Sequence, residues 1–367
     1  MGQDTEARTD PALYRFSAVE FGIFHEFERP AGMSEAQAFD NAFNLVEVAE
    51  DGGLHAVWLA ELHFSPKRSV LASPMLLAGA IGARTHTIKI GTAVQILPLC
   101  HPLQLAEEAA TVDHISRGRL IFGVGRSGFA RTYRHYGVPY AESRERFAET
   151  LDIVQRAWTE DTFSYNGKYF HYDDVCVVPK PYQQPHPPIR VAATSVDTFP
   201  AIGAQGFDLF AAVRTGTLSE LAPNLVAYRQ AYASAGRPGK GGVFLRVPVY
   251  VADTFDQAVE DCRDSIMGFY RQLGAQLEAS AAESGARAIE QRDVRGRRLQ
   301  EATFDEVLRE KVIVGTPEMV VERLGSIASE LELDGILAEL NCGGQVPREG
   351  VLKSLKLLCS EVMPAFA

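Results

Sequence analysis

The sequence predicts an α/β protein folded as a (β/α)8 barrel, and two observations lead to this prediction. Eight short, nearly continuous apolar segments recur along the chain, and helical patterns follow them. Parallel strands have this character because helices cover both faces of their sheet. The 367 residues suffice for one such barrel with added segments. A doubly wound open sheet is the alternative that the same alternation allows.

The expected strands are rich in β-branched and aromatic residues. They cover residues 18–24, 56–61, 88–93, 120–124, 189–193, 209–213, 244–251 and 335–339. The expected helices cover 34–51, 71–83, 102–116 and 144–160, then one that begins at Thr198, one that runs through Tyr228, and one at the C-terminus. In the first helix, Ser34 and Gln37 have the spacing of a capping box.

Two segments interrupt the alternation. Asn166 and Gly167 lie between aromatic residues, which is typical of a hairpin with a type I′ turn. Residues 274–310 form a long, polar, Arg-rich stretch without a strand pattern, either a solvated charged loop or a lid. We expect Ser284–Leu299 to be poorly ordered without substrate and to close over the site when it is filled. Residues 1–15 are expected to be a polar tail, and 16–367 a single domain.

Composition excludes several classes of function. The net charge of −11 argues against nucleic acid as a partner, because an acidic surface repels phosphate backbones. No apolar run is long enough to cross a membrane, and the N-terminus lacks the apolar core of a signal peptide. Five widely spaced cysteines without a CxxC pattern indicate a reduced, cytoplasmic protein without a zinc site, and no metal is expected.

The segment Gly123–Gly128 matches the pattern G-x-G-x-x-G and follows a strand. A dinucleotide-binding turn would follow the first strand and precede a clean helix, with an acidic residue about 20 positions later. None of these holds here, so we interpret the glycines as allowing a close approach to the backbone. The chain also lacks the G-x-S-x-G and HExxH motifs of hydrolases.

In a barrel, the residues that follow each strand lie at the C-terminal rim, where catalytic side chains gather. This rule selects His25 and His63 as candidate catalytic residues. It also selects Arg126 and a helix start at Ser195 and Thr198, because a guanidinium and a helix N-terminus both favour an anion. The alternatives are ordinary helix capping and histidines that are buried without a catalytic role.

Five stretches of the chain are similar, in order and spacing, to the bacterial luciferase-like flavin monooxygenases and most of all to the luciferase α subunit. They are VWLAELHF, IGTAVQILPLCHPLQLAEEAATVDHISRGRLIFGVGRSG, VAATSVDT, VGTPE and SLKLLCSEVMP. The resemblance runs from Phe21 to the C-terminus. It implies a (β/α)8 barrel, in agreement with the strand pattern, that binds reduced FMN at the rim and uses it with O2.

The resemblance also implies roles for individual residues. By motif position, Arg126, Ser195 and Thr198 would hold the flavin phosphate. Ala93 and Val94 would lie along the isoalloxazine ring. The family uses a non-prolyl cis peptide at this place, so we predict a cis Ala93–Val94 bond.

Three positions depart from the luciferase pattern. Leu62 replaces the first histidine of the usual E-H-H-F, which is the catalytic base of luciferase. Gly125 stands where the α subunit has a reactive cysteine, and Thr194, a further flavin-site position, stands where it has a glutamate. Light emission with a long-chain aldehyde is therefore not expected, and His63 or His25 must serve if a base is needed.

We expect a monooxygenase that takes reduced FMN from a separate reductase and oxygenates a small, apolar organic substrate. The apolar character follows from rim residues such as Phe24, Leu62 and Ile96. A deazaflavin-dependent hydride-transfer enzyme and a catalytically silent partner subunit are the alternatives. Leu62 favours the silent subunit, whereas Arg126 and Ser195 argue against it. Assembly as a homodimer or heterodimer is also expected.

Overall fold

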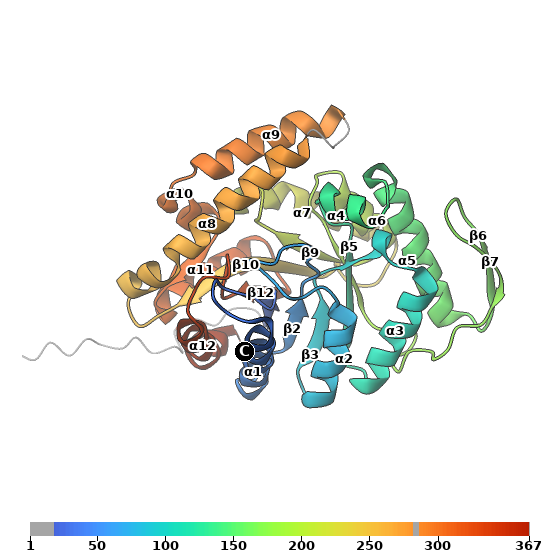
Figure 1. The fold of residues 1–367 in the computed structure, drawn as a ribbon, viewed down its shortest axis with the longest axis horizontal. Helices are drawn as coiled ribbons and strands as arrows, with labels where there is room; N and C mark the ends of the chain where they lie inside the picture. Colours follow the sequence, from blue (N-terminus) through green and yellow to red (C-terminus); the bar gives the residue numbers. More distant parts are fainter. Residues whose placement is uncertain (1–17, 282–285, 367) are drawn as a thin grey trace, which may run out of the picture.

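The computed structural model describes residues 18–281 and 286–366, and its main sheet closes into a barrel (Figure 1). Eight parallel strands form the closed path. In order they are β1 (Glu20–His25), β2 (Ala56–Leu59), β3 (Lys89–Thr92), β5 (Leu120–Gly125), β8 (Ile189–Ala192), β9 (Asp208–Ala212), β10 (Val243–Val251) and β12 (Gly335–Glu339). Because β12 pairs with β1, the sheet has no open edge on this path, and the predicted barrel is confirmed.

Helices between the strands cover the outside of the barrel. They include α1 (Glu35–Asp51), α2 (Pro74–Arg84), α3 (Pro102–Ile115), α5 (Ser143–Thr159), α6 (Thr198–Gln205), α7 (Leu218–Ser234) and α12 (Arg348–Leu357). The capping box of Ser34 and Gln37 is present. The second helix begins at Pro74, three residues later than predicted. Proline favours the first turn of a helix, because it has no N–H to donate there.

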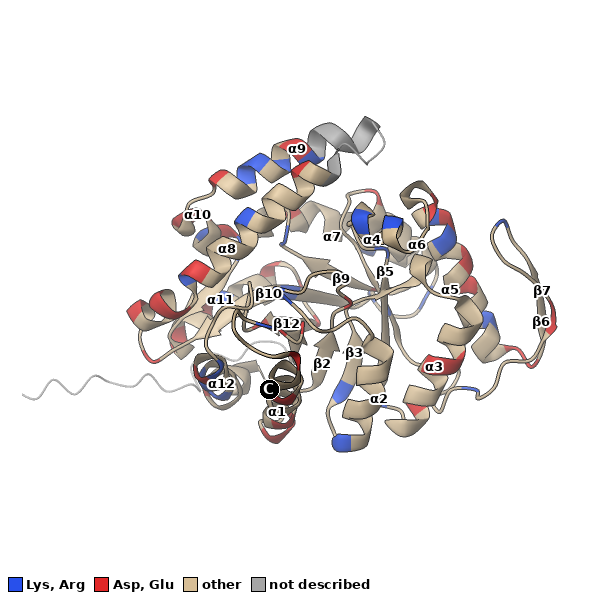
Figure 2. Ribbon diagram, in the orientation of Figure 1, with Lys and Arg blue, Asp and Glu red and all other residues tan. Residues whose placement is uncertain are grey.

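The sequence missed three short elements, β4 (Gln95–Ile96), α4 (Ala130–His135) and β11 (Ile313–Gly315), and one full-length helix, α11 (Pro317–Glu330). The strand β11 pairs only with β10, outside the closed path. The described helices include none that is long and apolar enough to cross a membrane. Figure 2 shows basic and acidic residues interspersed over the outer helices, without a separate basic face in this view.

The predicted hairpin is present, but its turn differs from the prediction. Strand β6 (Phe163–Asn166) pairs antiparallel with β7 (His171–Val175). Residues 167–170 connect them, and the Gly167 N–H donates to the Phe170 carbonyl at 2.9 Å, so the turn is centred on Lys168 and Tyr169 and not on Asn166 and Gly167. The Glu149 carboxylate of α5 holds this turn, because it accepts hydrogen bonds from the backbone N–H groups of Lys168 and Tyr169 at 2.7 and 3.0 Å.

The described residues of the polar segment 274–310 are mostly helical, which corrects the prediction of a loop. It comprises the end of α8 (Phe255–Ala281), then α9 (Ala286–Glu301) and α10 (Phe304–Glu310). Figure 1 shows α8 and α9 side by side. Their crossing depends on glycine, since a Cβ on Gly274 would lie 2.6 Å from the carbonyl oxygen of Gly296. Ser284, the first residue of the predicted lid, lies outside the described residues.

The interior of the barrel is filled by large side chains. Phe24, Trp58, Ile121, Phe210 and Phe244 are buried in one apolar cluster. The Trp58 ring lies over β3 where Gly91 has no side chain, and a Cβ there would be 2.0 Å from the ring. The barrel is therefore a packed core, and any ligand must lie at its ends.

The ends of β3 and β5 meet through one threonine and two glycines. The Thr92 hydroxyl donates to the Gly123 carbonyl at 2.6 Å and accepts from the Gly123 N–H at 3.1 Å. A Cβ on Gly123 would lie 1.8 Å from the Thr92 carbonyl oxygen, and one on Gly125 would lie 2.5 Å from Val94 Cγ2. The first two glycines of the motif are thus required by strand packing.

Gly123→Ala should destabilise the fold by about 3 kcal/mol, since the added methyl group meets backbone that cannot move aside. Gly128→Ala is the matched control, because nothing lies within 4 Å of its Cβ position and its φ is not left-handed. Urea unfolding of the two variants measures the difference. Equal losses of unfolding free energy would contradict this account of the motif.

Candidate active site at the C-terminal rim

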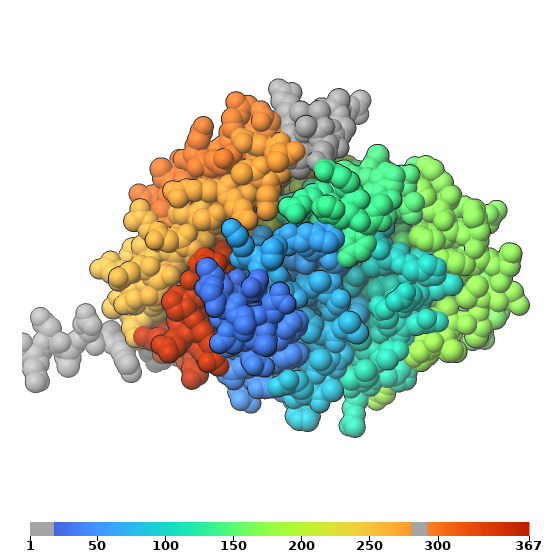
Figure 3. All heavy atoms as spheres, in the orientation of Figure 1, coloured from blue at the N-terminus to red at the C-terminus, as the bar shows by residue number. Residues whose placement is uncertain are grey.

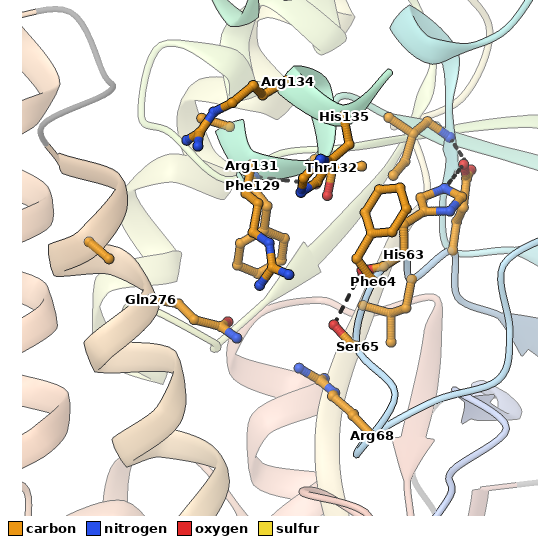
Figure 4. A pocket seen from close by; sticks show the side chains of 16 residues that line it. His63, Phe64, Ser65, Arg68, Phe129, Arg131, Thr132, Arg134, His135 and Gln276 are labelled. Carbon is orange, nitrogen blue, oxygen red and sulfur yellow. Dashed lines mark hydrogen bonds and ion pairs between the residues drawn. The ribbon is translucent and has the colours of Figure 1, made fainter. Parts of the chain in front are cut away.

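A cavity of about 330 Å³ lies at the C-terminal rim of the barrel. Three segments supply most of its lining: residues 61–68 after β2, residues 127–135 around α4, and Gln276 and Ala279 of α8. Ile96 of β4 completes it. Figure 3 shows the orange α8 and α9 meeting the green α4 segment and the blue segment after β2 on one face. Figure 4 shows Arg68, Arg131 and Gln276 extending into the cavity from these three segments.

His63 lines this cavity and belongs to a chain of hydrogen bonds. Its Nε2 lies 2.8 Å from a Glu61 carboxylate oxygen, and its Nδ1 lies 3.1 Å from the Tyr136 hydroxyl. If Nε2–H donates to Glu61, Nδ1 is left to accept from the Tyr136 O–H. Glu61 orients His63 as an acidic partner orients a catalytic histidine. The sequence did not indicate Tyr136, which comes from a distant segment.

Glu61 is itself held by the backbone that follows β3. Its second oxygen accepts from the Ile96 N–H at 2.6 Å and from the Gln95 side chain at 2.9 Å. The side chains of Glu61 and His63 are 5% and 7% exposed. Both carboxylate oxygens are therefore satisfied, and the imidazole is fixed in one orientation.

His25 occupies a different environment. It ends β1, is 4% exposed, and its Nδ1 lies 2.9 Å from a Glu28 carboxylate oxygen. Its Nε2 is buried without a partner among the described residues. His25 is not among the residues that line the cavity, so the structure brings only one of the two candidate histidines to the cavity surface.

The Ala93–Val94 peptide bond is cis, as predicted. Ala93, Val94 and Leu62 pack against the apolar cluster inside the barrel and form an apolar surface at its end. Because a Cβ at position 125 would meet Val94, the packing itself disfavours a cysteine at this position. Leu62 also lines the cavity, so an apolar side chain stands at the position of the luciferase base.

The residues proposed to hold a phosphate come from the neighbouring strands β5 and β8. Arg126 directly follows β5, and burial lowers the pKa of its guanidinium. Ser195 Oγ lies 2.6 Å from Thr198 Oγ1 at the start of α6, while Thr194 beside them is exposed. These groups supply a cation and two hydroxyls, the donor chemistry that a phosphate requires.

An ion pair adjoins these residues and was not expected from the sequence. Arg144 Nη2 lies 2.6 Å from Asp197 Oδ2, and both side chains are more than half exposed. The Asp197 carboxylate bears a charge unfavourable to a phosphate, and Arg144 compensates it. Both groups also act on the charge of Arg126, which places them in one electrostatic neighbourhood.

A buried cluster of charges lies under the other side of the rim. The carboxylate of Glu26 accepts two hydrogen bonds from Arg68, at 2.6 and 2.5 Å. Arg246 lies 2.8 Å from Glu339 and 3.3 Å from Glu26, with its guanidinium 3.4 Å from the centroid of the Phe24 ring. Arg214, which follows β9, completes the cluster.

Residues 19–331 match the family of luciferase-like monooxygenases. The chain belongs to this family. The barrel and the cis bond after β3 agree with the expectations drawn from the sequence motifs. Among the described residues, no group of three or more His, Cys, Asp or Glu side chains is arranged to hold a metal.

One relative by sequence and two solved structures are similar to this chain over nearly its whole length. The oxygenase component of the flavin-dependent trigonelline monooxygenase of Acinetobacter baylyi is 25% identical over 95% of this chain and 96% of its own. The FMN-bound oxygenating constituent of 3,6-diketocamphane monooxygenase from Pseudomonas putida has a TM-score of 0.78 at 20% identity, covering 95% and 99%. An F420-dependent secondary alcohol dehydrogenase has a TM-score of 0.73 at 18% identity, covering 95% and 99%.

The buried charge cluster generates a prediction about acid stability. Burial raises the pKa of Glu26, but Arg68 and Arg246 outweigh it and lower the pKa from 4.5 to about 2. The stabilisation that Glu26 provides is therefore complete above about pH 4.5 and is lost as the pH falls towards 2. Glu26→Gln should be less stable at neutral pH and should lose less further stability in this range.

Urea unfolding at several pH values tests this prediction. Glu47→Gln is the control, because the Glu47–Arg84 pair is exposed and contributes little. If the unfolding free energy of Glu26→Gln and of the unaltered protein fell in parallel below pH 4.5, Glu26 would not be the group that confers acid sensitivity.

Proposed function

We propose that this chain is the oxygenase component of a two-component monooxygenase. It takes reduced FMN from a separate reductase and, with O2, oxygenates a small organic substrate with an apolar skeleton. The observation that carries the proposal is an apolar surface, Ala93–Val94, at the end of β3, with Arg126 directly after the neighbouring strand β5. The family relative named as an oxygenase component supports the separate reductase.

The residues present fit a flavin mononucleotide. The missing side chain at Gly125 lets Val94 pack over the end of β5, and the apolar surface of Leu62, Ala93 and Val94 suits a flat ring. Arg126, Ser195 and Thr198 supply the phosphate donors. Bound reduced FMN would supply the electrons for oxygen chemistry, so the work left to the protein is to position the reactants and exclude water.

Proton handling in this proposal belongs to His63. Its imidazole lines the cavity, and Glu61 aligns it through Nε2. On the other side of the ring, Nδ1 accepts a hydrogen bond from the Tyr136 hydroxyl. Burial raises the pKa of the Tyr136 hydroxyl, so this group keeps its proton at neutral pH and acts as a donor. Leu62 at the neighbouring position keeps the wall of the cavity apolar.

The helix α9 lies across the α4 side of the rim. Arg292 donates to the Gly128 carbonyl at 3.3 Å and to the Tyr140 hydroxyl at 2.9 Å. These contacts join α9, which packs on α8, to the loop that carries Arg126. We include in the proposal that α9 acts as a lid by releasing and remaking these contacts, which lets the substrate enter and then excludes water.

The likeness to an F420-dependent enzyme, which shows the fold alone, keeps deazaflavin-dependent hydride transfer as the second candidate. Oxygen uptake separates the two. The protein with reduced FMN should alter the rate at which O2 reoxidises the flavin, because a flavin held in a dry site reacts differently from one in water. Reduced deazaflavin coenzyme should not bind. Tight binding of the deazaflavin, with FMN reoxidation unchanged by the protein, would contradict the proposal.

A further inference from the structure

We propose that the substrate of this cavity is an organic carboxylate and that Arg214 is the residue that selects it. This inference rests on the proposed function, because it names the substrate class for the same site. It changes the expectation of a purely apolar substrate into one of an apolar skeleton that carries an acidic group.

The charge of the cavity lining is opposite to that of the whole protein. The chain carries a net charge of −11, yet Arg68, Arg131 and Arg134 line the cavity and Glu61 is its one lining carboxylate among the described residues. Arg68 is paired with Glu26, but Arg131 and Arg134 still outnumber Glu61 among the charged lining side chains. A cavity with this balance attracts an anion and repels a cation.

Arg214 presents the two nitrogen atoms that grip a carboxylate. Its Nε and Nη2 atoms are buried and have no acceptor among the described residues. In Arg68 the same two atoms hold both oxygens of Glu26, at 2.6 and 2.5 Å. This side of a guanidinium matches the spacing of carboxylate oxygens, which makes the paired contact both strong and selective. A buried donor pair without an acceptor is costly, and a bound carboxylate relieves that cost.

The nearby carboxylates are committed to other partners. Glu26 is held by Arg68, Glu339 by Arg246, and Glu28 lies against His25. Burial lowers the pKa of Arg214 to about 10, with Arg246 and Arg68 adding to the effect, so Arg214 still carries its charge at neutral pH. The cluster therefore contains one cationic group more than its carboxylates compensate.

Arg214 is next to the cavity, behind Phe129. The Phe129 ring lines the cavity, and its centroid is 5.8 Å from Arg214 Cζ. Phe269 of α8 packs on Arg214 at 5.6 Å and on Arg68 at 5.0 Å, which joins the two arginines through one ring. In this proposal Phe129 turns aside as the carboxylate enters, and the apolar part of the substrate lies against Leu62 and Ile96.

Lys311 fixes the loop that carries Arg214. Lys311 is buried, and its ammonium group donates to the backbone carbonyls of Val213 and Gly216 on either side of Arg214. Burial lowers the pKa of Lys311 to about 8. A loop held by a buried cation positions the guanidinium, as a binding site requires of its supporting residues.

Benzoate and benzamide form a matched pair of probes, because they have the same ring and nearly the same shape but differ in charge. Their binding to the flavin-free protein is measured by calorimetry and by thermal shift at equal ionic strength. We expect benzoate to bind about tenfold more tightly than benzamide, as one charge-assisted pair allows. Arg214→Met should abolish this preference, and Arg309→Met, an exposed site with the same change in charge, should keep it.

The folding of Arg214→Met is checked in the same thermal scans. The variant should melt at the same or a higher temperature than the unaltered protein, because it replaces an uncompensated buried charge by an apolar side chain of similar length. Arg214→Lys keeps the charge but loses the paired donors and should retain only part of the preference. If Arg214→Met is too unstable to test, Arg214→Lys still decides the role of the paired donors.

Three outcomes would overturn the inference: equal binding of the two probes, no binding of either, or a benzoate preference that survives in Arg214→Met. Arg126→Ala must leave the preference intact, since otherwise benzoate is occupying the proposed phosphate site. The test uses no flavin, so its result is separable from that of the proposed function. A protein that reacts with reduced FMN and O2 but prefers neither probe refutes this inference alone.

Discussion

The contact between the ends of β3 and β5 positions the residues to which we assign the chemistry of this molecule. Thr92 joins the two strands through both of its hydrogen bonds to Gly123, and the absence of side chains at Gly123 and Gly125 lets the backbones approach. The chain that leaves β3 then forms the apolar Ala93–Val94 surface. From there the Ile96 N–H reaches Glu61, which aligns His63. The proposed ring surface and the histidine thus depend on one strand contact.

Electrostatics divides the rim into two regions. On one side, Arg126 shares an electrostatic neighbourhood with the exposed Arg144–Asp197 pair, and Ser195 and Thr198 follow the adjacent strand, which suits a phosphate close to solvent. On the other side, Arg68, Arg214 and Arg246 are arranged around two buried carboxylates. Removing Glu26 alone is costly, because it leaves buried guanidinium groups without their partner, but the network as a whole contributes little net stability, because desolvation offsets the attraction between its charges. We therefore interpret the second region as a functional arrangement and not as a stabilising one.

The sequence predicted the features that are local or periodic. All eight strands of the barrel, including β1, were visible in the sequence as apolar runs, so the barrel was predictable. The cis bond after Ala93 was predictable only through the resemblance to a known family. The helices α8 and α9 were missed in part because their crossing depends on two glycines, Gly274 and Gly296, that look like helix breakers in a polar stretch.

Other parts of the site could not be predicted because they form only in three dimensions. Tyr136 joins His63 from a segment 73 residues away, and Arg246 meets Glu26 across 220 residues. No spacing in the chain indicates either contact. Arg214 showed no motif at all, since its significance lies in two nitrogen atoms that the folded chain leaves without an acceptor. Side-chain networks of this kind follow from the closure of the barrel.

We propose that reduced FMN lies at the contact between β3 and β5 with its phosphate on Arg126. The most direct test compares the binding of FMN and of riboflavin, which lacks the phosphate, to the unaltered protein and to Arg126→Ala. The variant should lose about 2 kcal/mol of binding free energy for FMN and much less for riboflavin, because a charge-assisted contact is removed from a partly desolvated site. Arg156→Ala, on the outer face of α5, should change neither. Equal losses for the two flavins in Arg126→Ala would contradict the account.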